Sequence, residues 1–127
     1  MSAPESSRID DYVITKKLIV TEKTASGLVY IRTMPNPTGN ALALGQMVNV
    51  NYAGRLLNDK EFDSGNFSFQ LGVGRVVQGF DEGIAKMRVG EKATIIFPST
   101  LGYGNQAQGS IPKNSPLIFE VEVISAK

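Results

Sequence analysis

Three short motifs place aromatic and aliphatic side chains next to very few reactive groups. They are Phe-Asp-Ser at 62–64, Val-Val-Gln-Gly-Phe at 76–80 and Gly-Tyr-Gly at 102–104. The chain has no histidine and no cysteine, so it lacks both the usual general base and a thiolate nucleophile. A hydrophobic cup of this kind suits a reaction that breaks no bond, such as rotation about an Xaa–Pro peptide bond.

The barrier to that rotation is roughly 18–20 kcal/mol, because twisting the bond destroys the amide resonance. The twisted transition state has lost charge separation between nitrogen and carbonyl oxygen, so water stabilises it less than it stabilises the planar form. An apolar pocket removes this water and therefore favours the twisted form. A few hydrogen bonds must hold the flanking backbone while one side of the bond turns.

The residue types predict which side chains would meet these needs. We expect the polar contacts from Asp63, Tyr103 and the backbone near Ile111. The expected walls and floor are Tyr52, Phe62, Phe67, Val76, Val77, Phe80 and Phe119. Purely structural roles stay open at this point, because phenylalanines on alternating strands are often plain core, and Tyr103 and Asp63 also fit turns.

The elements that must position these residues are mostly strands. One helix is predicted over 77–87, where Phe80, Ile84 and Met87 form a single apolar stripe and Gly90 is a suitable C-cap. Antiparallel strands with one short helix indicate an α+β fold. The long segment 98–116 is typical of a binding loop or flap. The strand patterns cover 28–33, 46–52, 54–57, 67–71, 91–97 and 117–123.

The N-terminal part has a different character. Residues 1–8 are small and polar, and we expect them to be disordered. Residues 9–20 carry acids early and lysines late, which suits a helix dipole and predicts a helical extension. That helix either packs on its own domain or forms a linker or dimer contact. We therefore divide the chain into an extension, 1–25, and a domain, 26–127.

Composition excludes several classes of function. The chain has 127 residues, 42% of them hydrophobic, and a net charge of +1 without clustered cations, so nucleic-acid binding is not expected. A Ser-His-Asp triad and a zinc site with Cys or His ligands are impossible. No apolar run is long enough to span a membrane, and no signal peptide is visible. Gly-Val-Gly at 72–74 lacks the third glycine of a dinucleotide fingerprint, so we expect no cofactor. Asp81 and Glu82 begin the predicted helix, where acids favour the dipole, so we expect no metal site there.

The motifs, in their order and spacing, resemble the FKBP-type peptidyl-prolyl cis–trans isomerases, the immunophilins that bind tacrolimus and rapamycin. The resemblance covers about residues 27–127. It rests on six blocks: VNYAGRLL at 50–57, FDS at 62–64, FSFQLG at 67–72, VVQGFDEGIAKMRVGE at 76–91, IFPSTLGYG at 96–104 and IPKNSPLIFEVEV at 111–123.

This resemblance implies an antiparallel sheet of five or six strands wrapped around one short helix. It also implies isomerase activity on proline-containing peptides and unfolded proteins, without a cofactor, and binding of macrolides such as tacrolimus or rapamycin. The catalytic residues implied by motif position are Tyr52, Phe62, Asp63, Phe80, Tyr103 and Phe119. The implied substrate-binding residues are Phe67, Phe69, Val76, Val77 and Ile111.

The chain departs from the family pattern at several positions. Phe80 stands where relatives often have Trp, which implies a roomier pocket. Only Gly65 and Asn66 separate Ser64 from Phe67, so the longer loop whose Arg pairs with the Asp in many relatives has no counterpart, and Asp63 is expected to be less anchored. Gly102 replaces an Ala of the family pattern, while Ser110 and Lys113 replace Ile and Pro and alter the predicted flap rather than the floor.

Two expectations go beyond the residues of the pocket. The extension followed by Thr-Ala-Ser-Gly-Leu-Val-Tyr at 24–30 resembles bacterial FKBPs of the cell envelope and favours a periplasmic or envelope location over the cytoplasm. The alternatives to an enzyme are a non-catalytic binding or chaperone module on the same fold, or an interaction domain unrelated to proline.

Overall fold

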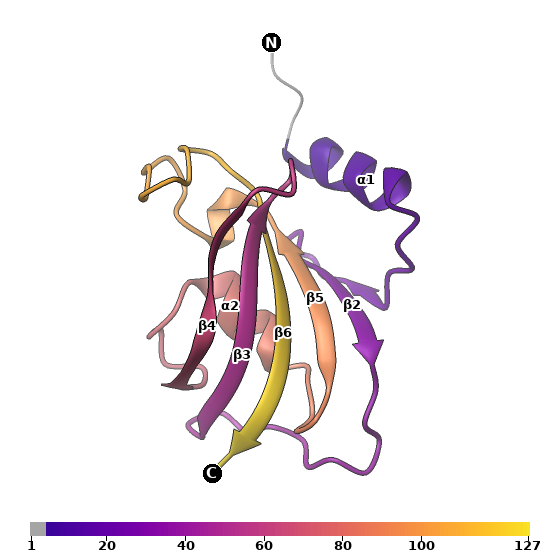
Figure 1. Cartoon of the computed structure of the whole chain (residues 1–127), viewed down its shortest axis with the longest axis vertical. Coiled ribbons are helices and arrows are strands. Elements are labelled where there is room, and N and C mark those ends of the chain that lie inside the picture. The colour runs from indigo at the N-terminus through magenta and orange to yellow at the C-terminus, as the bar shows by residue number, and fades with distance from the viewer. Residues whose placement is uncertain (1–4) are drawn as a thin grey trace.

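The computed structural model describes residues 5–127 and contains a six-stranded antiparallel sheet (Figure 1). The predicted α+β class is confirmed, with six strands in the sheet. Across the sheet the strand order is β1-β2-β5-β6-β3-β4. The strands are β1 (Glu22–Lys23), β2 (Val29–Met34), β3 (Met47–Leu56), β4 (Glu61–Gln70), β5 (Lys92–Phe97) and β6 (Leu117–Ala126).

The helix α2 (Gln78–Ile84) packs against one face of the curved sheet and closes the main core (Figure 1). Two glycines let the helix approach the strands closely: a Cβ atom added at Gly79 would lie 2.4 Å from the ring of Phe97. The helix is shorter than the predicted 77–87, because the Met87 N–H bonds to the carbonyl of Ile84 in a tighter turn. Met87 is nevertheless buried, as its place in the apolar stripe predicts.

The helix α1 (Glu5–Thr15) covers part of the opposite face of the sheet. Ile9, which is only 2% exposed, packs in a second core cluster with residues of β2, β5 and β6, and Tyr12 and Val13 pack against it. The structure therefore contains the first of the two alternatives for this helix, which packs on its own domain.

The bounds of α1 differ from the predicted 9–20. Residues 5–8 form its first turn, so the expectation of disorder is wrong for them, whereas residues 1–4 lie outside the described residues. The helix ends earlier because Lys17 has a φ of +56°, and the Leu18 N–H bonds back to the carbonyl of Val13. This left-handed termination is a common helix end.

Strand β3 joins the two predicted strands 46–52 and 54–57, and β4 is longer than the predicted 67–71. The expected short loop at Gly65 and Asn66 is instead part of β4, because these residues pair with Tyr52 and Asn51 of β3. The Asn66 side-chain amide also donates to the Oδ1 atoms of Asn49, at 3.0 Å, and Asn51, at 2.8 Å. These bonds join β4 to β3 next to Gly65, a residue type that weakens strand pairing.

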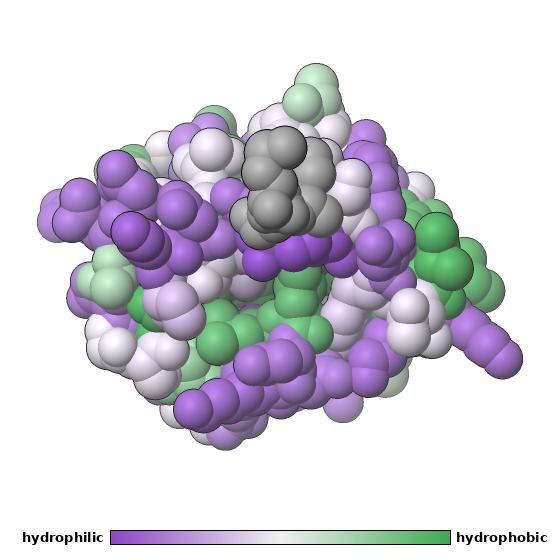
Figure 2. Space-filling model, turned by 90° about the horizontal axis from the view of Figure 1, so that it is seen from above, coloured by the Kyte–Doolittle hydropathy of each residue, from purple (hydrophilic) through white to green (hydrophobic). Residues whose placement is uncertain are grey.

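The segment 98–116 crosses one end of the sheet and begins with a single 3-10 turn, η1 (Ser99–Leu101). The same end carries α1 and the turn between β3 and β4 (Figure 1). Viewed from above in Figure 2, this end shows polar residues around a narrow apolar hollow. Within residues 5–127, no helix has both the length and the apolar character needed to cross a membrane.

Candidate active site

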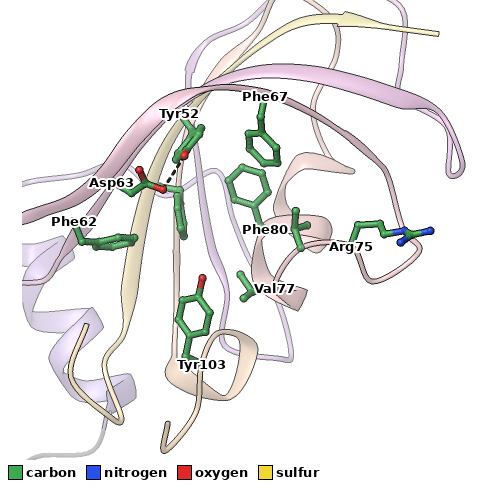
Figure 3. Close-up of a pocket in the computed structure, with 10 residues that line it drawn as sticks. Tyr52, Phe62, Asp63, Phe67, Arg75, Val77, Phe80 and Tyr103 are labelled. Carbon is green, nitrogen blue, oxygen red and sulfur yellow. Dashed lines mark hydrogen bonds between the residues drawn. The ribbon is translucent and has the colours of Figure 1, made fainter. Parts of the chain in front are cut away.

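A cavity of about 480 Å³ opens beside α2, between strands β3 and β4 and the segment 98–116 (Figure 3). Its walls come from five parts of the chain that are distant in sequence. The fold therefore brings together nine of the eleven residues that the sequence predicts for the site. The lining residues are Tyr52, Phe62, Asp63, Phe67, Arg75, Val76, Val77, Phe80, Tyr103 and Phe119.

Aromatic rings form the floor and much of the wall. Phe80, at the start of α2, is 3% exposed and lies centrally, with its ring centroid 5.0 Å from that of Phe119 and 5.8 Å from that of Phe67. Phe62 meets Phe119 edge to face at 5.7 Å, and Tyr52 meets Phe67 in the same way at 5.2 Å. Such contacts between rings fix their orientation, so the cavity has rigid apolar walls.

Asp63 lies at the edge of the cavity and is held by Tyr52. The Tyr52 hydroxyl donates a 2.8 Å hydrogen bond to Oδ2 of Asp63, while Oδ1 accepts the backbone N–H of Ser64 at 2.9 Å. The bond to Asp63, together with burial, raises the pKa of Tyr52 to about 12. Within this structure a tyrosine from the neighbouring strand and the Ser64 backbone hold Asp63, while the weaker anchoring expected relative to the family stays a prediction.

Two lining residues carry a hydrogen-bond donor without a partner in the described part of the chain. The Val77 backbone precedes α2 and its carbonyl accepts from Phe80 and Asp81, but its N–H bonds to none of residues 5–127. In Figure 3 the Tyr103 hydroxyl points toward the aromatic rings, and the one hydrogen bond drawn joins Tyr52 to Asp63. A bound molecule with carbonyl groups could accept from both donors.

Two predicted substrate-binding residues do not line the cavity. Phe69 points to the same side of β4 as Phe67 but lies behind it, buried and stacked on the Phe67 ring at 5.5 Å. Ile111 packs in the main core, where a short turn pairs its backbone with that of Gln108. Both residues support the walls rather than form them.

Arg75 lines the cavity and was not predicted. It is exposed, and in Figure 3 its guanidinium points away from the rings, on the side of the cavity opposite to Asp63. Its place directly before the Val-Val pair is the signal that could have identified it. Among residues 5–127, no group of three or more acidic side chains could together hold a metal ion.

Comparison with known proteins gives the chain a family. Residues 39–124 match the family model described as FKBP-type peptidyl-prolyl cis-trans isomerase. FK506-binding protein 1 of Dictyostelium discoideum is 43% identical over 105 residues, which cover 78% of this chain and 98% of that protein. FK506-binding protein 4 of Mycosarcoma maydis is 39% identical over 98% of this chain, which spans only 34% of that longer protein.

Solved structures agree with these matches. FkpA from Escherichia coli superposes with a TM-score of 0.83 and 32% identity, over 97% of this chain and 59% of that one. AtFKBP13 superposes with a TM-score of 0.77 and 32% identity, over 83% of this chain and 97% of that one. The curated relatives named above are eukaryotic and give the expected bacterial origin no support, so that origin stays a prediction. The sequence match and the shared fold together place this chain in the FKBP-type peptidyl-prolyl cis–trans isomerase family.

Proposed function

We propose that this domain, residues 26–127, accelerates rotation about Xaa–Pro bonds in peptides and unfolded proteins by enclosing the prolyl ring in its aromatic cavity. The observation that carries the proposal is the combination of rigid apolar walls with two unpaired donors, the Val77 N–H and the Tyr103 hydroxyl. Family membership supports the same class of reaction.

In this mechanism the walls exclude water from the bond that turns. The planar amide is the more polar form, so loss of water raises its free energy more than that of the twisted transition state. The rings of Phe80 and Phe119, 5.0 Å apart and nearly perpendicular, offer a floor and a wall to a flat prolyl ring. No proton is transferred in any step.

The polar groups hold the substrate backbone. The Val77 N–H and the Tyr103 hydroxyl donate to substrate carbonyl groups, and Asp63 accepts from the substrate or orients it at the edge. One side of the Xaa–Pro bond is thereby fixed while the other rotates. Tyr52 acts on Asp63 through its 2.8 Å hydrogen bond as well as lining the wall.

The same cavity is proposed to bind macrolides such as tacrolimus or rapamycin. A macrolide with an apolar ring and carbonyl acceptors would use the same apolar walls and donors as a prolyl peptide. The names of the FK506-binding relatives support this ligand class.

The test is the cis–trans exchange rate of a Leu-Pro peptide, measured by NMR with and without the protein. We expect substoichiometric protein to accelerate exchange, and a stoichiometric macrolide to abolish the acceleration. Peptide binding without acceleration would identify the domain as a non-catalytic binding or chaperone module. Neither binding nor acceleration would leave an interaction domain unrelated to proline.

A further inference from the structure

The first described residue of α1 contacts the segment that carries Tyr103. Glu5 accepts two hydrogen bonds from Ser99, the backbone N–H at 2.6 Å on Oε1 and the hydroxyl at 2.7 Å on Oε2. Ser99 is 3% exposed and begins η1. Hydrogen bonds to a carboxylate are stronger than those between neutral groups, so both carboxylate oxygens bind one buried residue firmly.

Ser99 in turn holds both neighbours of Tyr103. Its carbonyl accepts the N–H of Gly102 at 2.9 Å and the N–H of Gly104 at 2.8 Å. Tyr103 itself is 36% exposed, and it lies between two glycines that do not restrict the backbone by themselves. The orientation of the Tyr103 ring therefore depends on the position of Ser99.

A second contact from α1 reaches the far end of the same segment. The Arg8 guanidinium donates to the carbonyl of Asn114 at 3.2 Å, and the Asn114 N–H donates to the carbonyl of Gly104 at 2.8 Å. Glu5 and Arg8, one helical turn apart, thus bind the segment on both sides of Tyr103.

The helix is itself fixed to the sheet and can serve as a rigid base. Ile9 is buried among residues of three strands, and the Tyr12 hydroxyl donates to Oδ1 of Asp59 at 2.6 Å. Lys16 pairs with the other oxygen of Asp59 at 2.6 Å. Ile9 thus fixes the helix to the sheet, while Tyr12 and Lys16, the residue after its last turn, fix it to the turn that joins β3 to β4, and none of these contacts involves segment 98–116.

We propose that α1 orders the substrate-binding segment, and that Glu5 is a positioning residue which acts through Ser99 on Tyr103. This inference rests on the proposed isomerase function. A free segment of this length would lose conformational entropy each time it closed on a peptide. Because α1 holds it in place beforehand, the Tyr103 hydroxyl is already aimed at the cavity when the substrate arrives.

The test is a double-mutant cycle in the full chain, read by Leu-Pro exchange rates. We expect Glu5→Ala to lower the catalysed rate about five- to tenfold, as loss of a charged hydrogen bond permits. The reduction should disappear when Tyr103→Phe is already present, because the lost hydroxyl no longer needs to be oriented. Glu5→Gln should retain most activity, since its amide can bind both Ser99 groups.

The matched control is Asp10→Ala on the same helix. Asp10 pairs with Lys23 at 3.2 Å, outside segment 98–116, so this variant should exchange at the wild-type rate. NMR gives a second readout: the chemical shifts of the Tyr103 ring should move toward those of a freely mobile tyrosine in Glu5→Ala and should stay unchanged in Asp10→Ala.

Three results would overturn the inference: full activity in Glu5→Ala, full activity in Tyr103→Phe, or the same loss from Glu5→Ala with and without the Tyr103 hydroxyl. An inactive wild-type protein would instead refute the proposed function. In that case the Tyr103 resonances still decide whether Glu5 orders the segment.

Discussion

Replacing Tyr52 by phenylalanine removes one hydroxyl and leaves the aromatic wall intact. The lost hydroxyl donates a 2.8 Å bond to the Asp63 carboxylate, and this bond is the main reason why the pKa of Tyr52 is raised from 10.0 to about 12. The shift sets an upper bound on the free energy that the bond contributes to folding. Two pKa units correspond to ~2.7 kcal/mol. Asp63 is exposed, and water competes for the bond, so we expect Tyr52→Phe to lower the free energy of unfolding by about 1 kcal/mol.

The pH dependence of this contribution has a definite sign. The folded state raises the pKa of Tyr52, so it favours the protonated hydroxyl. The stabilisation is fully present below the unfolded pKa, near 10, and disappears as pH rises toward about 12. Urea unfolding of the wild type and Tyr52→Phe should therefore differ at neutral pH and converge at strongly alkaline pH.

The same variant should slow catalysed exchange by about fivefold, the rate equivalent of about 1 kcal/mol, because Asp63 is no longer held at the cavity edge. The matched control is Thr21→Val, which loses a 2.9 Å bond from the Arg32 backbone N–H at the β1–β2 edge of the sheet, far from the cavity. We expect the control to lose similar stability and no activity. Equal slowing in both variants, or full activity in Tyr52→Phe, would refute the assigned link between Tyr52 and Asp63.

Three further predictions follow from the packing and the residue types around the cavity. Phe80→Ala should cost ~3–5 kcal/mol of stability, because Phe80 is 3% exposed among other rings. Phe80→Leu is the better test of the floor: this variant should still fold, but it should catalyse peptide exchange more slowly than the wild type. Full activity in Phe80→Leu would contradict a role for this ring. Gly79→Ala should lower the free energy of unfolding in urea by ~1–3 kcal/mol, because the new methyl group would lie 2.4 Å from the Phe97 ring. This clash outweighs the better helix propensity of alanine. The control Gln78→Ala, at an exposed position one residue earlier, should have little effect. The acceleration should be constant between about pH 6 and about pH 8, since the chain has no histidine and the mechanism moves no proton; a bell-shaped profile would contradict it.

Much of the cavity could be predicted because its residues occur in short motifs of unusual composition. The period of two along 67–71 correctly places Phe67 and Phe69 on one side of their strand, but it carries no information on depth. Phe69 is therefore buried behind Phe67 instead of lining the cavity. The apolar stripe likewise predicts that Phe80 and Met87 face the core, although the helix ends before Met87.

The features that were missed depend on contacts between distant residues. The bond from Tyr52 to Asp63 requires the register of two strands, and no local pattern specifies which residues face each other. The contact of Glu5 with Ser99 spans 94 positions in the chain, and it explains why α1 begins earlier than its sequence pattern indicates. Propensity alone also could not show that Gly65 and Asn66 continue a strand, because glycine and asparagine are common in turns.

The central claim is that a prolyl ring lies between the aromatic rings of the cavity while its peptide bond turns. Intermolecular NOEs, recorded on a Leu-Pro peptide under the conditions of accelerated exchange, test this claim most directly. We expect contacts from the prolyl ring protons to the rings of Phe80 and Phe119, which face the cavity 5.0 Å apart. Accelerated exchange with NOEs only to the outer face of the sheet, or with none to these two rings, would contradict it.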